Sequence, residues 1–229
     1  MASPPVWLFD LDNTLHNASH ASLPQMGEAM GRYMQRELQI DKPTADALRR
    51  RYFERYGATL LGLVRHNGVD AAHFLHETHL LPGMEALVHG HGHDIAALRA
   101  LRGRKILLTN APRRYTERVL GVLGIARFFD AVMCVEDMAM FGQLRPKPDA
   151  RMLRRLAARL RVHPSRCVLV EDALENLRGA RRVGMQTVWM QRWTRRATSG
   201  AAAAARVTMA PAYVDCRLLG LPALKRRRW

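Results

Sequence analysis

Short apolar runs alternate with helix-like patterns along most of the chain. Val6 to Phe9 is a continuous apolar run that ends in a polar turn at Asp10, a pattern typical of a buried parallel strand. Later runs are separated by stretches in which apolar residues recur every three or four positions. These runs predict strands at 105–108, 131–135, 167–170 and 187–190, with 212–216 as a candidate edge strand. The alternation predicts an α/β fold with a Rossmann-like parallel sheet covered by helices.

The stretch between the first two predicted strands has a helical pattern throughout. We therefore predict an α/β core formed by residues 1–18 and 89–229, with residues 19–88 inserted after the first strand as an α-helical cap. Just after the insertion, Asp94 is predicted to cap the helix that precedes the second strand. Residues 198–205 are rich in alanine, so they form either a flexible insert or a short helix.

The net charge of the chain is unusual, whereas its content of hydrophobic residues is not. Of 229 residues, 48% are hydrophobic, as in globular proteins, but the formal net charge is +16. A protein this basic attracts anions such as phosphorylated metabolites or nucleic acid. Its arginines are spread along the sequence, which favours biased composition over a dedicated nucleic-acid-binding arm.

The expected compartment follows from what the sequence lacks. No apolar run is long enough to cross a membrane, and no signal-peptide pattern is found. The three cysteines are widely spaced without a CxxC pattern, which disfavours a disulfide framework. We therefore expect a cytoplasmic protein that makes no membrane contact, and the spread of its arginines disfavours a dedicated nucleic-acid partner.

Polar residues follow the predicted strands at the edge where parallel sheets bind ligands. They are Asp10, Asp12 and Thr14 after the first strand, Thr109 and Asn110 after the second, and Glu171 and Asp172 after the fourth, with Lys147 before it. A carboxylate can attack phosphorus, and a second one two residues later can protonate the leaving oxygen. Acids from neighbouring strands can hold Mg²⁺, and a lysine can neutralise the transferring group.

These residues resemble, in order and spacing, the four motifs of the haloacid dehalogenase-like (HAD) hydrolase superfamily. The resemblance covers Val6 to about Met190, and residues 19–88 look like the helical cap of one subgroup. It implies that Asp10 is the nucleophile that forms an aspartyl-phosphate and that Asp12 is the general acid and base. The ligands that it implies for Mg²⁺ are Asp10, the backbone carbonyl of Asp12, Asp172 and, directly or through water, Glu171. The groups that it implies for the phosphate are Thr109, Asn110 and Lys147.

The resemblance also narrows the reaction. Dehalogenating relatives lack the second aspartate because a halide leaves without a proton, so Asp12 favours phosphoryl transfer. Relatives that cleave phosphorus–carbon bonds use a lysine of the cap, and the insertion contains only Lys42. A phosphosugar mutase shares the Glu171-Asp172 pair and stays an alternative.

A narrower resemblance concerns the substrate. Residues 9–15, 56–63 and 109–111 look like the pyrimidine 5′-nucleotidase branch, whose substrates are nucleoside monophosphates such as UMP and CMP. Thr14 in the core is a candidate substrate-binding residue. The candidates for binding the leaving group are Tyr56, Thr59 and Arg65 in the insertion. Tyr56 also lies on an apolar helical stripe, so a core position is at least as well supported.

Several alternatives stay open at this point. Within the enzyme class, they are a phosphoglycolate or sugar-phosphate phosphatase and the mutase. From another class, the +16 charge allows a basic nucleic-acid-associated protein on the same scaffold. The histidines at 73, 76 and 79 and at 89, 91 and 93 lack the spacing of a zinc helix. The oligomeric state is not predicted.

Overall fold

The computed structural model describes residues 4–193, 209–226 and 229, so the alanine-rich stretch 198–205 lies outside the described residues. The chain divides into two compact units, Met1–His20 with Val88–Trp229, and Ala21–Leu87. We call the first the α/β unit and the second the helical unit. In the described ranges, no helix is both long and apolar enough to cross a membrane.

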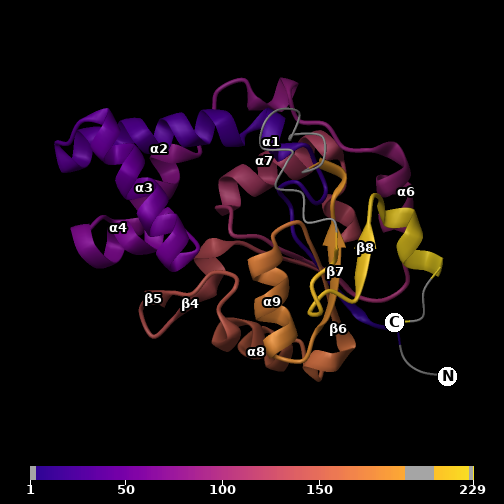
Figure 1. Ribbon diagram of the computed structural model, residues 1–229. Coiled ribbons are helices and arrows are strands. Elements are labelled where there is room, and N and C mark those ends of the chain that lie inside the picture. Colours follow the sequence, from indigo (N-terminus) through magenta and orange to yellow (C-terminus); the bar gives the residue numbers. More distant parts are fainter. Residues whose placement is uncertain (1–3, 194–208, 227–228) are drawn as a thin grey trace. The chain divides into compact units, whose positions relative to one another are not determined.

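A parallel sheet forms the centre of the α/β unit (Figure 1). Within the described residues it has six strands in the order β3-β2-β1-β6-β7-β8, and each neighbouring pair is parallel. The strands are β1 (Val6–Phe9), β2 (Lys105–Leu108), β3 (Ala131–Met133), β6 (Cys167–Glu171), β7 (Gln186–Met190) and β8 (Cys216–Leu218). The predicted α/β fold with a Rossmann-like sheet is thereby confirmed.

Four predicted strands differ from the observed ones at their ends. β6 extends to Glu171 and β7 begins at Gln186, so each is one residue longer than predicted. β3 stops at Met133 because the 3-10 helix η3 (Val135–Met138) begins two residues later. The predicted edge strand at 212–216 is shifted, because β8 begins at Cys216 and pairs with β7 over Val188 to Met190.

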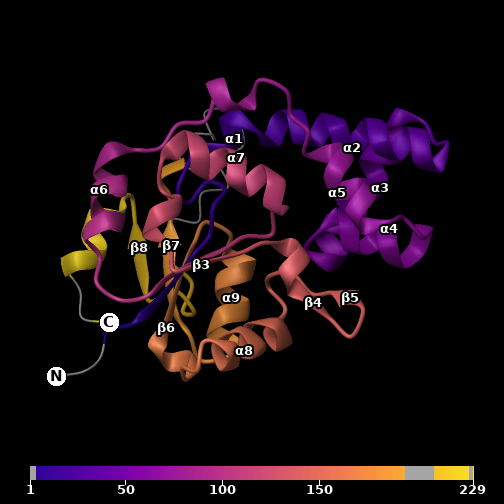
Figure 2. The same cartoon turned by 180° about the vertical axis from the view of Figure 1, so that it is seen from behind.

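Helices cover both faces of the sheet, α8 (Ala150–Arg159) and α9 (Leu174–Arg182) on one and α6 (Gly92–Ala100) and α7 (Arg113–Leu123) on the other (Figure 2). This division follows from right-handed crossovers on either side of β1. On the first face, Leu153 and Leu177 pack in one cluster with Leu8 and Leu169 of the sheet. Asp149 caps α8 by accepting hydrogen bonds from the N–H groups of the helix start.

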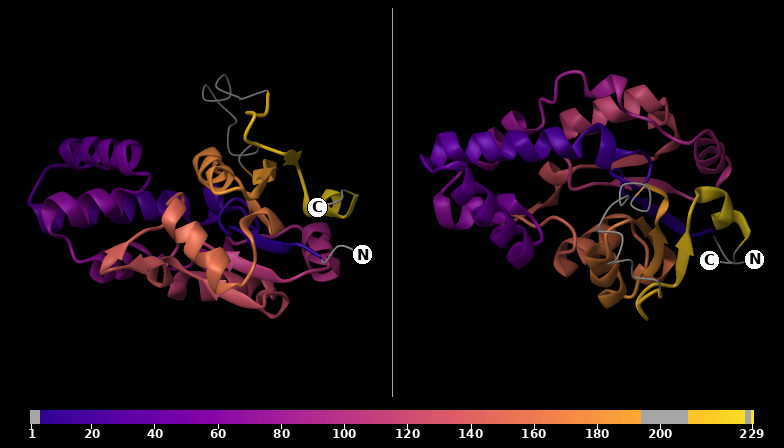
Figure 3. Two further views of the ribbon diagram at one scale, coloured as in Figure 1. Left: turned by 90° about the horizontal axis from the view of Figure 1, so that it is seen from below. Right: turned by 45° about the horizontal axis from the view of Figure 1, so that its top comes forward.

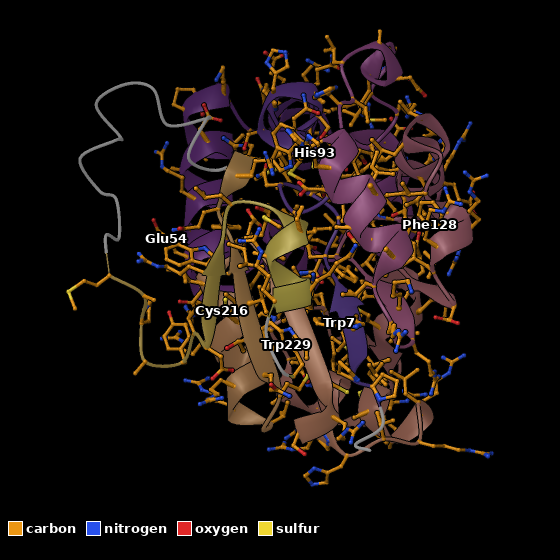
Figure 4. All side chains as sticks on the ribbon, turned by 90° about the vertical axis from the view of Figure 1, so that its right-hand side faces the viewer. Trp7, Glu54, His93, Phe128, Cys216 and Trp229 are labelled. Atoms are coloured by element: carbon orange, nitrogen blue, oxygen red, sulfur yellow. The ribbon has the colours of Figure 1, made fainter. Side chains whose placement is uncertain are left out.

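Aromatic side chains fill part of the opposite face. Trp7 of β1 packs edge-to-face on Trp229 with ring centroids 5.5 Å apart, and both are labelled in Figure 4. The indole N–H of Trp7 donates to the carbonyl of Arg102 at 2.8 Å, so the buried ring has no unpaired donor. Phe9 packs in the same way on Phe129.

Asp94 does not cap α6, contrary to the sequence-based expectation. The helix begins at Gly92, and Asp94 lies in its first turn with only 4% of its surface exposed. Its Oδ2 lies 2.9 Å from Nε of Arg192, and its Oδ1 accepts a hydrogen bond from the N–H of Leu221 at 2.7 Å. The carboxylate therefore joins α6 to the chain after β7 and to the 3-10 helix η6 (Leu221–Arg226).

The carboxyl ends of the parallel strands share one edge of the sheet. This edge is at the top in Figure 1 and comes forward in the right-hand view of Figure 3. The chain between β3 and β6 also contains a short antiparallel hairpin, β4 (Ala139–Met140) with β5 (Gln143–Leu144).

The helical unit is built from four helices, which are α2 (Leu23–Leu38), α3 (Lys42–Tyr56), α4 (Thr59–Asn67) and α5 (Ala71–Thr78). A short helix α1 (Ala18–Ala21) precedes them, and the 3-10 helix η1 (Met84–Ala86) follows. α3 and α4 end at Gly57 and Gly68, which have φ of 76° and 65°, a conformation that glycine adopts without strain. Phe53 of α3 is 62% exposed.

We expect Asp94→Ala to destabilise the protein by about 3 kcal/mol, because it leaves the Arg192 guanidinium partly buried without its carboxylate. The measurement is the midpoint of urea unfolding. Asp46→Ala is the matched control, because it breaks an exposed ion pair with Lys42 and should change stability little. Equal small effects of both variants would contradict the structural role of Asp94.

Candidate active site

A buried lysine ammonium lies between two carboxylates at the carboxyl edge of the sheet. Nζ of Lys147 donates to Oδ1 of Asp10 at 2.7 Å and to Oε2 of Glu171 at 2.8 Å. The exposed fractions of these residues are 2% for Lys147, 6% for Asp10 and 1% for Glu171. Asp10 follows β1 and Glu171 ends β6, so the parallel pairing of these neighbouring strands brings the two acids together.

Lys147 lies on a loop, and two neighbours hold its backbone. The side chain of Asn110, which follows β2, accepts a hydrogen bond from the N–H of Lys147 at 2.9 Å and donates to its carbonyl at 3.0 Å. Gly179 of α9 packs on Pro148, the residue that follows Lys147. A Cβ on Gly179 would lie 2.5 Å from the carbonyl oxygen of Pro148. The ammonium is therefore positioned by contacts from β2 and α9.

Burial sets the protonation of the acidic groups. It is the largest cause that raises the pKa of Asp10 to about 7; the charge of Glu171 adds to the effect and that of Lys147 opposes it. Burial, with Glu171 and Asp10, also raises the pKa of Asp172 well above its ordinary value. Burial by itself lowers the pKa of Lys147, but the two carboxylates outweigh it and the net shift is upward.

The acidic side chains at this edge fit a divalent cation. Among the residues that the structure describes, Asp10, Glu171 and Asp172 form one group whose ligand atoms lie within 4.8 Å of one another. Carboxylate oxygens are the ligands that Mg²⁺ prefers. A cation there would favour the ionised forms of Asp10 and Asp172, whose pKa values are raised by burial and, after it, by repulsion between the carboxylates. The predicted fourth contributor, the backbone carbonyl of Asp12, lies two residues after Asp10.

Asp12 is oriented by residues that the sequence analysis did not single out. The hydroxyl of Tyr115 donates to Oδ1 of Asp12 at 2.6 Å, and Nε2 of His16 lies 2.9 Å from the same oxygen. Asn13 lies in the turn between Asp12 and His16. It has a φ of 56°, and its side chain accepts a hydrogen bond from the N–H of Ser19 at 2.8 Å. No motif indicates Tyr115, because it lies on α7, 103 residues from Asp12.

The remaining predicted residues of the α/β unit lie in the same loops. Thr109 follows β2, is 1% exposed and accepts a hydrogen bond from the N–H of Ala111. Thr14 is also buried, and its Oγ1 has no hydrogen-bond partner among the described residues. Both hydroxyls keep the ability to donate, which is the property that a phosphate site requires. Their substrate-binding roles stay predictions.

The predicted residues of the helical unit differ from one another. Tyr56 is half-buried, its hydroxyl pairs with Nε2 of His66, and the guanidinium of Arg65 lies 6.0 Å from its ring centroid. Arg65 is exposed, so its charge is accessible. Thr59 is 7% exposed, and its hydroxyl donates to the carbonyl of Arg49 at 3.4 Å.

Other nucleophiles fit the chemistry less well. Burial is the largest cause that raises the pKa values of Cys134 and Cys167 to about 11, so almost none of either thiol is ionised near neutral pH. Lys42, the candidate amine for phosphorus–carbon cleavage, is exposed and paired with Asp46 at 2.7 Å.

Comparison with known proteins decides the family. The family model described as haloacid dehalogenase-like hydrolase matches residues 6–184. The chain belongs to this family. The match includes Asp10, Asp12, Lys147 and the Glu171-Asp172 pair, which are the residues gathered at the sheet edge.

Several curated relatives of this HAD-like hydrolase are named as phosphatases. It is 29% identical over 192 residues to validoxylamine A 7′-phosphate phosphatase of Streptomyces hygroscopicus subsp. limoneus, which covers 79% of this chain and 82% of that protein. It is 27% identical over 200 residues to phosphoglycolate phosphatase of Pseudomonas putida, covering 81% and 68%. The matches support a phosphatase that acts on a phosphate monoester.

A solved structure shares the fold of this HAD-like hydrolase. The crystal structure of a HAD phosphatase from Thermococcus onnurineus superposes with a TM-score of 0.62 at 22% identity, covering 97% of this chain and 96% of that one. At this identity the likeness concerns the fold.

We expect Gly179→Ala to lower activity, because the new methyl group would push Pro148 and with it the backbone of Lys147. The loss of stability should be about 1–3 kcal/mol, the usual range for overpacking. Gly121→Ala in α7 is the matched control, since nothing lies within 4 Å of its Cβ position. Phosphate release and melting temperature are measured for both. Unchanged activity of Gly179→Ala would contradict the packing role.

We expect Mg²⁺ to raise the melting temperature more at about pH 8 than at about pH 5.5, because carboxyl groups must lose their protons to bind a cation. With the pKa of Asp10 raised to about 7, protonation weakens binding as the pH falls through this value. Scanning calorimetry with and without Mg²⁺ at both pH values provides the measurement, and Asp172→Asn should remove most of the shift. A shift that is equal at both pH values would count against this site.

Proposed function

We propose that this chain is a Mg²⁺-dependent phosphatase that hydrolyses a small phosphomonoester through an aspartyl-phosphate on Asp10. The observation that carries the proposal is the pairing of Asp10 and Glu171 with one buried ammonium, with Asp172 beside them and Asp12 two residues away. This combines a nucleophile, a cation site and a second carboxylate that can handle protons. The HAD-like family and the phosphatases among its relatives support it.

In the proposed reaction, a carboxylate oxygen of Asp10 attacks phosphorus and the bond from phosphorus to the leaving oxygen breaks. Asp12 donates a proton to that oxygen and then accepts one from the water that attacks the aspartyl-phosphate, which releases phosphate and restores Asp10. Lys147 keeps Asp10 in place and offsets the charge of the transferring group. When bound, Mg²⁺ would supply further charge neutralisation at the phosphate oxygens.

The site requires Asp10 to be ionised, and its environment works against this. Burial is the largest cause that raises its pKa to about 7, so the environment favours the protonated carboxyl more than water does. A cation held by Asp10 and Asp172 would favour the ionised form, which links metal binding to nucleophile activation. This is the physical reason for proposing that the reaction depends on Mg²⁺.

Our first candidate for the substrate is a pyrimidine nucleoside 5′-monophosphate. The sequence resemblance to that branch supports it, as does the aromatic and cationic pair Tyr56 and Arg65, which can stack on a planar base and pair with an anion. The second candidate is phosphoglycolate or a sugar phosphate, because related phosphatases carry these or similar names. We propose residues 19–88 as the cap that selects between them.

Charge is consistent with an anionic substrate. The helical unit has eight acidic and eight basic residues, so the whole surplus of +16 lies on the α/β unit. A positive field around an acidic site attracts phosphate esters. We propose that this surplus favours substrate capture, and that the protein is cytoplasmic.

We expect Asp10→Asn to reduce phosphate release by at least about a thousandfold while the fold stays intact, because the amide cannot attack phosphorus. The assay uses Mg²⁺ with UMP, CMP, dTMP, AMP, phosphoglycolate, glucose phosphates and an aryl phosphate. Preference for UMP and CMP would support the first candidate, and preference for phosphoglycolate or glucose phosphates the second. Activity of Asp10→Asn near that of the wild type would refute the nucleophile.

A further inference from the structure

Two buried aromatic side chains, those of Tyr115 and His16, contact the same carboxylate oxygen of Asp12. The hydroxyl of Tyr115 donates to Oδ1 at 2.6 Å, and Nε2 of His16 lies 2.9 Å from it. Tyr115 and His16 are both 0% exposed, whereas the side chain of Asp12 is 24% exposed. The carboxylate therefore faces a buried aromatic pair on one side and is accessible on another.

The contacts of His16 determine which of its nitrogens donates. Its Nδ1 is buried and has no hydrogen-bond partner among the described residues. A proton on Nδ1 would be a buried donor without an acceptor, which is costly, so the ring proton belongs on Nε2 and points to Asp12. With the tyrosine hydroxyl, this makes two donors on Oδ1.

The two donors approach Asp12 from separate parts of the chain. His16 follows Asp12 by four residues and forms an isolated bridge with it. Tyr115 comes from the start of α7, five residues after Asn110, and also lies 3.4 Å from Nε2 of His16. Because the groups are fixed from two directions, the side chain of Asp12 has one preferred orientation.

We propose that Tyr115 and His16 are positioning residues that aim Asp12 as the proton donor to the leaving oxygen, an inference that rests on the proposed function. With Oδ1 accepting from both, the proton that Asp12 transfers is carried by Oδ2. During transfer, the bond between this proton and Oδ2 breaks, a bond to the leaving oxygen forms, and Oδ1 stays bound by the two donors. Charge-assisted bonds of this kind stabilise the carboxylate that remains.

The predicted signature is a dependence on the leaving group. An alcohol with a high pKa needs its proton in the transition state, whereas nitrophenolate leaves without one. A misoriented Asp12 should therefore slow the hydrolysis of esters of ordinary alcohols and leave the hydrolysis of activated aryl esters nearly unchanged. A loss of fold or of metal binding would slow all esters by the same factor.

The experiment measures kcat/KM of the Mg²⁺-loaded protein for glycerol 2-phosphate, phenyl phosphate and 4-nitrophenyl phosphate. This parameter reports the steps up to departure of the alcohol, so slow hydrolysis of the aspartyl-phosphate does not mask the effect. For Tyr115→Phe, we expect a loss of about 10-fold with glycerol 2-phosphate and of less than about twofold with 4-nitrophenyl phosphate.

Tyr33→Phe provides the matched control. Tyr33 is another buried tyrosine whose hydroxyl pairs with a histidine, Nδ1 of His73 at 3.0 Å, but it lies in the helical unit. This control should change none of the three esters selectively. His16→Leu, which removes the second donor, should repeat the pattern of Tyr115→Phe, and His16→Gln, which keeps an N–H donor, should restore part of the loss.

The outcomes separate this inference from the proposed function. If the wild type hydrolyses the esters and Asp10→Asn does not, the function stands, and an equal loss of Tyr115→Phe on all esters, or no loss, overturns the positioning role. If the wild type releases no phosphate from any ester, the proposed function itself fails. Should Tyr115→Phe unfold, the comparison of His16→Leu with His16→Gln decides the question by the same criterion.

Discussion

The ammonium of Lys147, buried between the carboxylates of Asp10 and Glu171, is the interaction on which the rest of the site depends. Three charged groups removed from water are tolerated only when they neutralise one another at hydrogen-bond distance. Without the lysine, two carboxylates would face each other in the interior. Its contacts reach far into the fold, because Asn110 after β2 holds its backbone and Gly179 of α9 packs on the next residue.

This arrangement gives the site more acid than its single buried cation neutralises. Asp172 adds a further carboxyl group to Asp10 and Glu171. Burial, and after it the repulsion between these carboxylates, raises the pKa values of Asp10 and Asp172. A divalent cation would offset this excess of acid, so metal binding and the reactivity of Asp10 are two aspects of one electrostatic problem. Active sites commonly retain groups that destabilise the folded protein, because the same groups perform the reaction.

Sequence reasoning succeeded where the signal is local. The apolar run of β1 predicted a buried strand. The acids that follow this run predicted where the polar side chains gather, since parallel strands end at a common edge of the sheet. It failed where a contact joins distant segments. Asp94 has the sequence setting of a helix cap, but its partners Arg192 and Leu221 lie 98 and 127 residues further along the chain.

The candidate site shows the same division. Asp10, Asp12, Lys147 and the Glu171-Asp172 pair at the end of β6 stand out because motif spacing is a property of the chain. Tyr115 is an ordinary apolar position of α7, and its hydroxyl gains meaning only from the carboxylate that lies 2.6 Å from it in the fold. In the sequence, Gly179 is only a poor helix former. The structure shows that Pro148 lies too close to Gly179 for any side chain to fit there.

The most direct test of the central claim is to identify the residue that carries the phosphoryl group. The protein is mixed with an activated aryl phosphate and Mg²⁺, quenched in acid within the first turnover and treated with borohydride, which reduces an acyl phosphate to an alcohol. The account predicts homoserine in place of aspartate at position 10 in the peptide mass spectrum, and none in the Lys147→Met variant if that lysine is needed to hold the nucleophile. Reduction at another acid, or an unmodified Asp10 during active turnover, would contradict it.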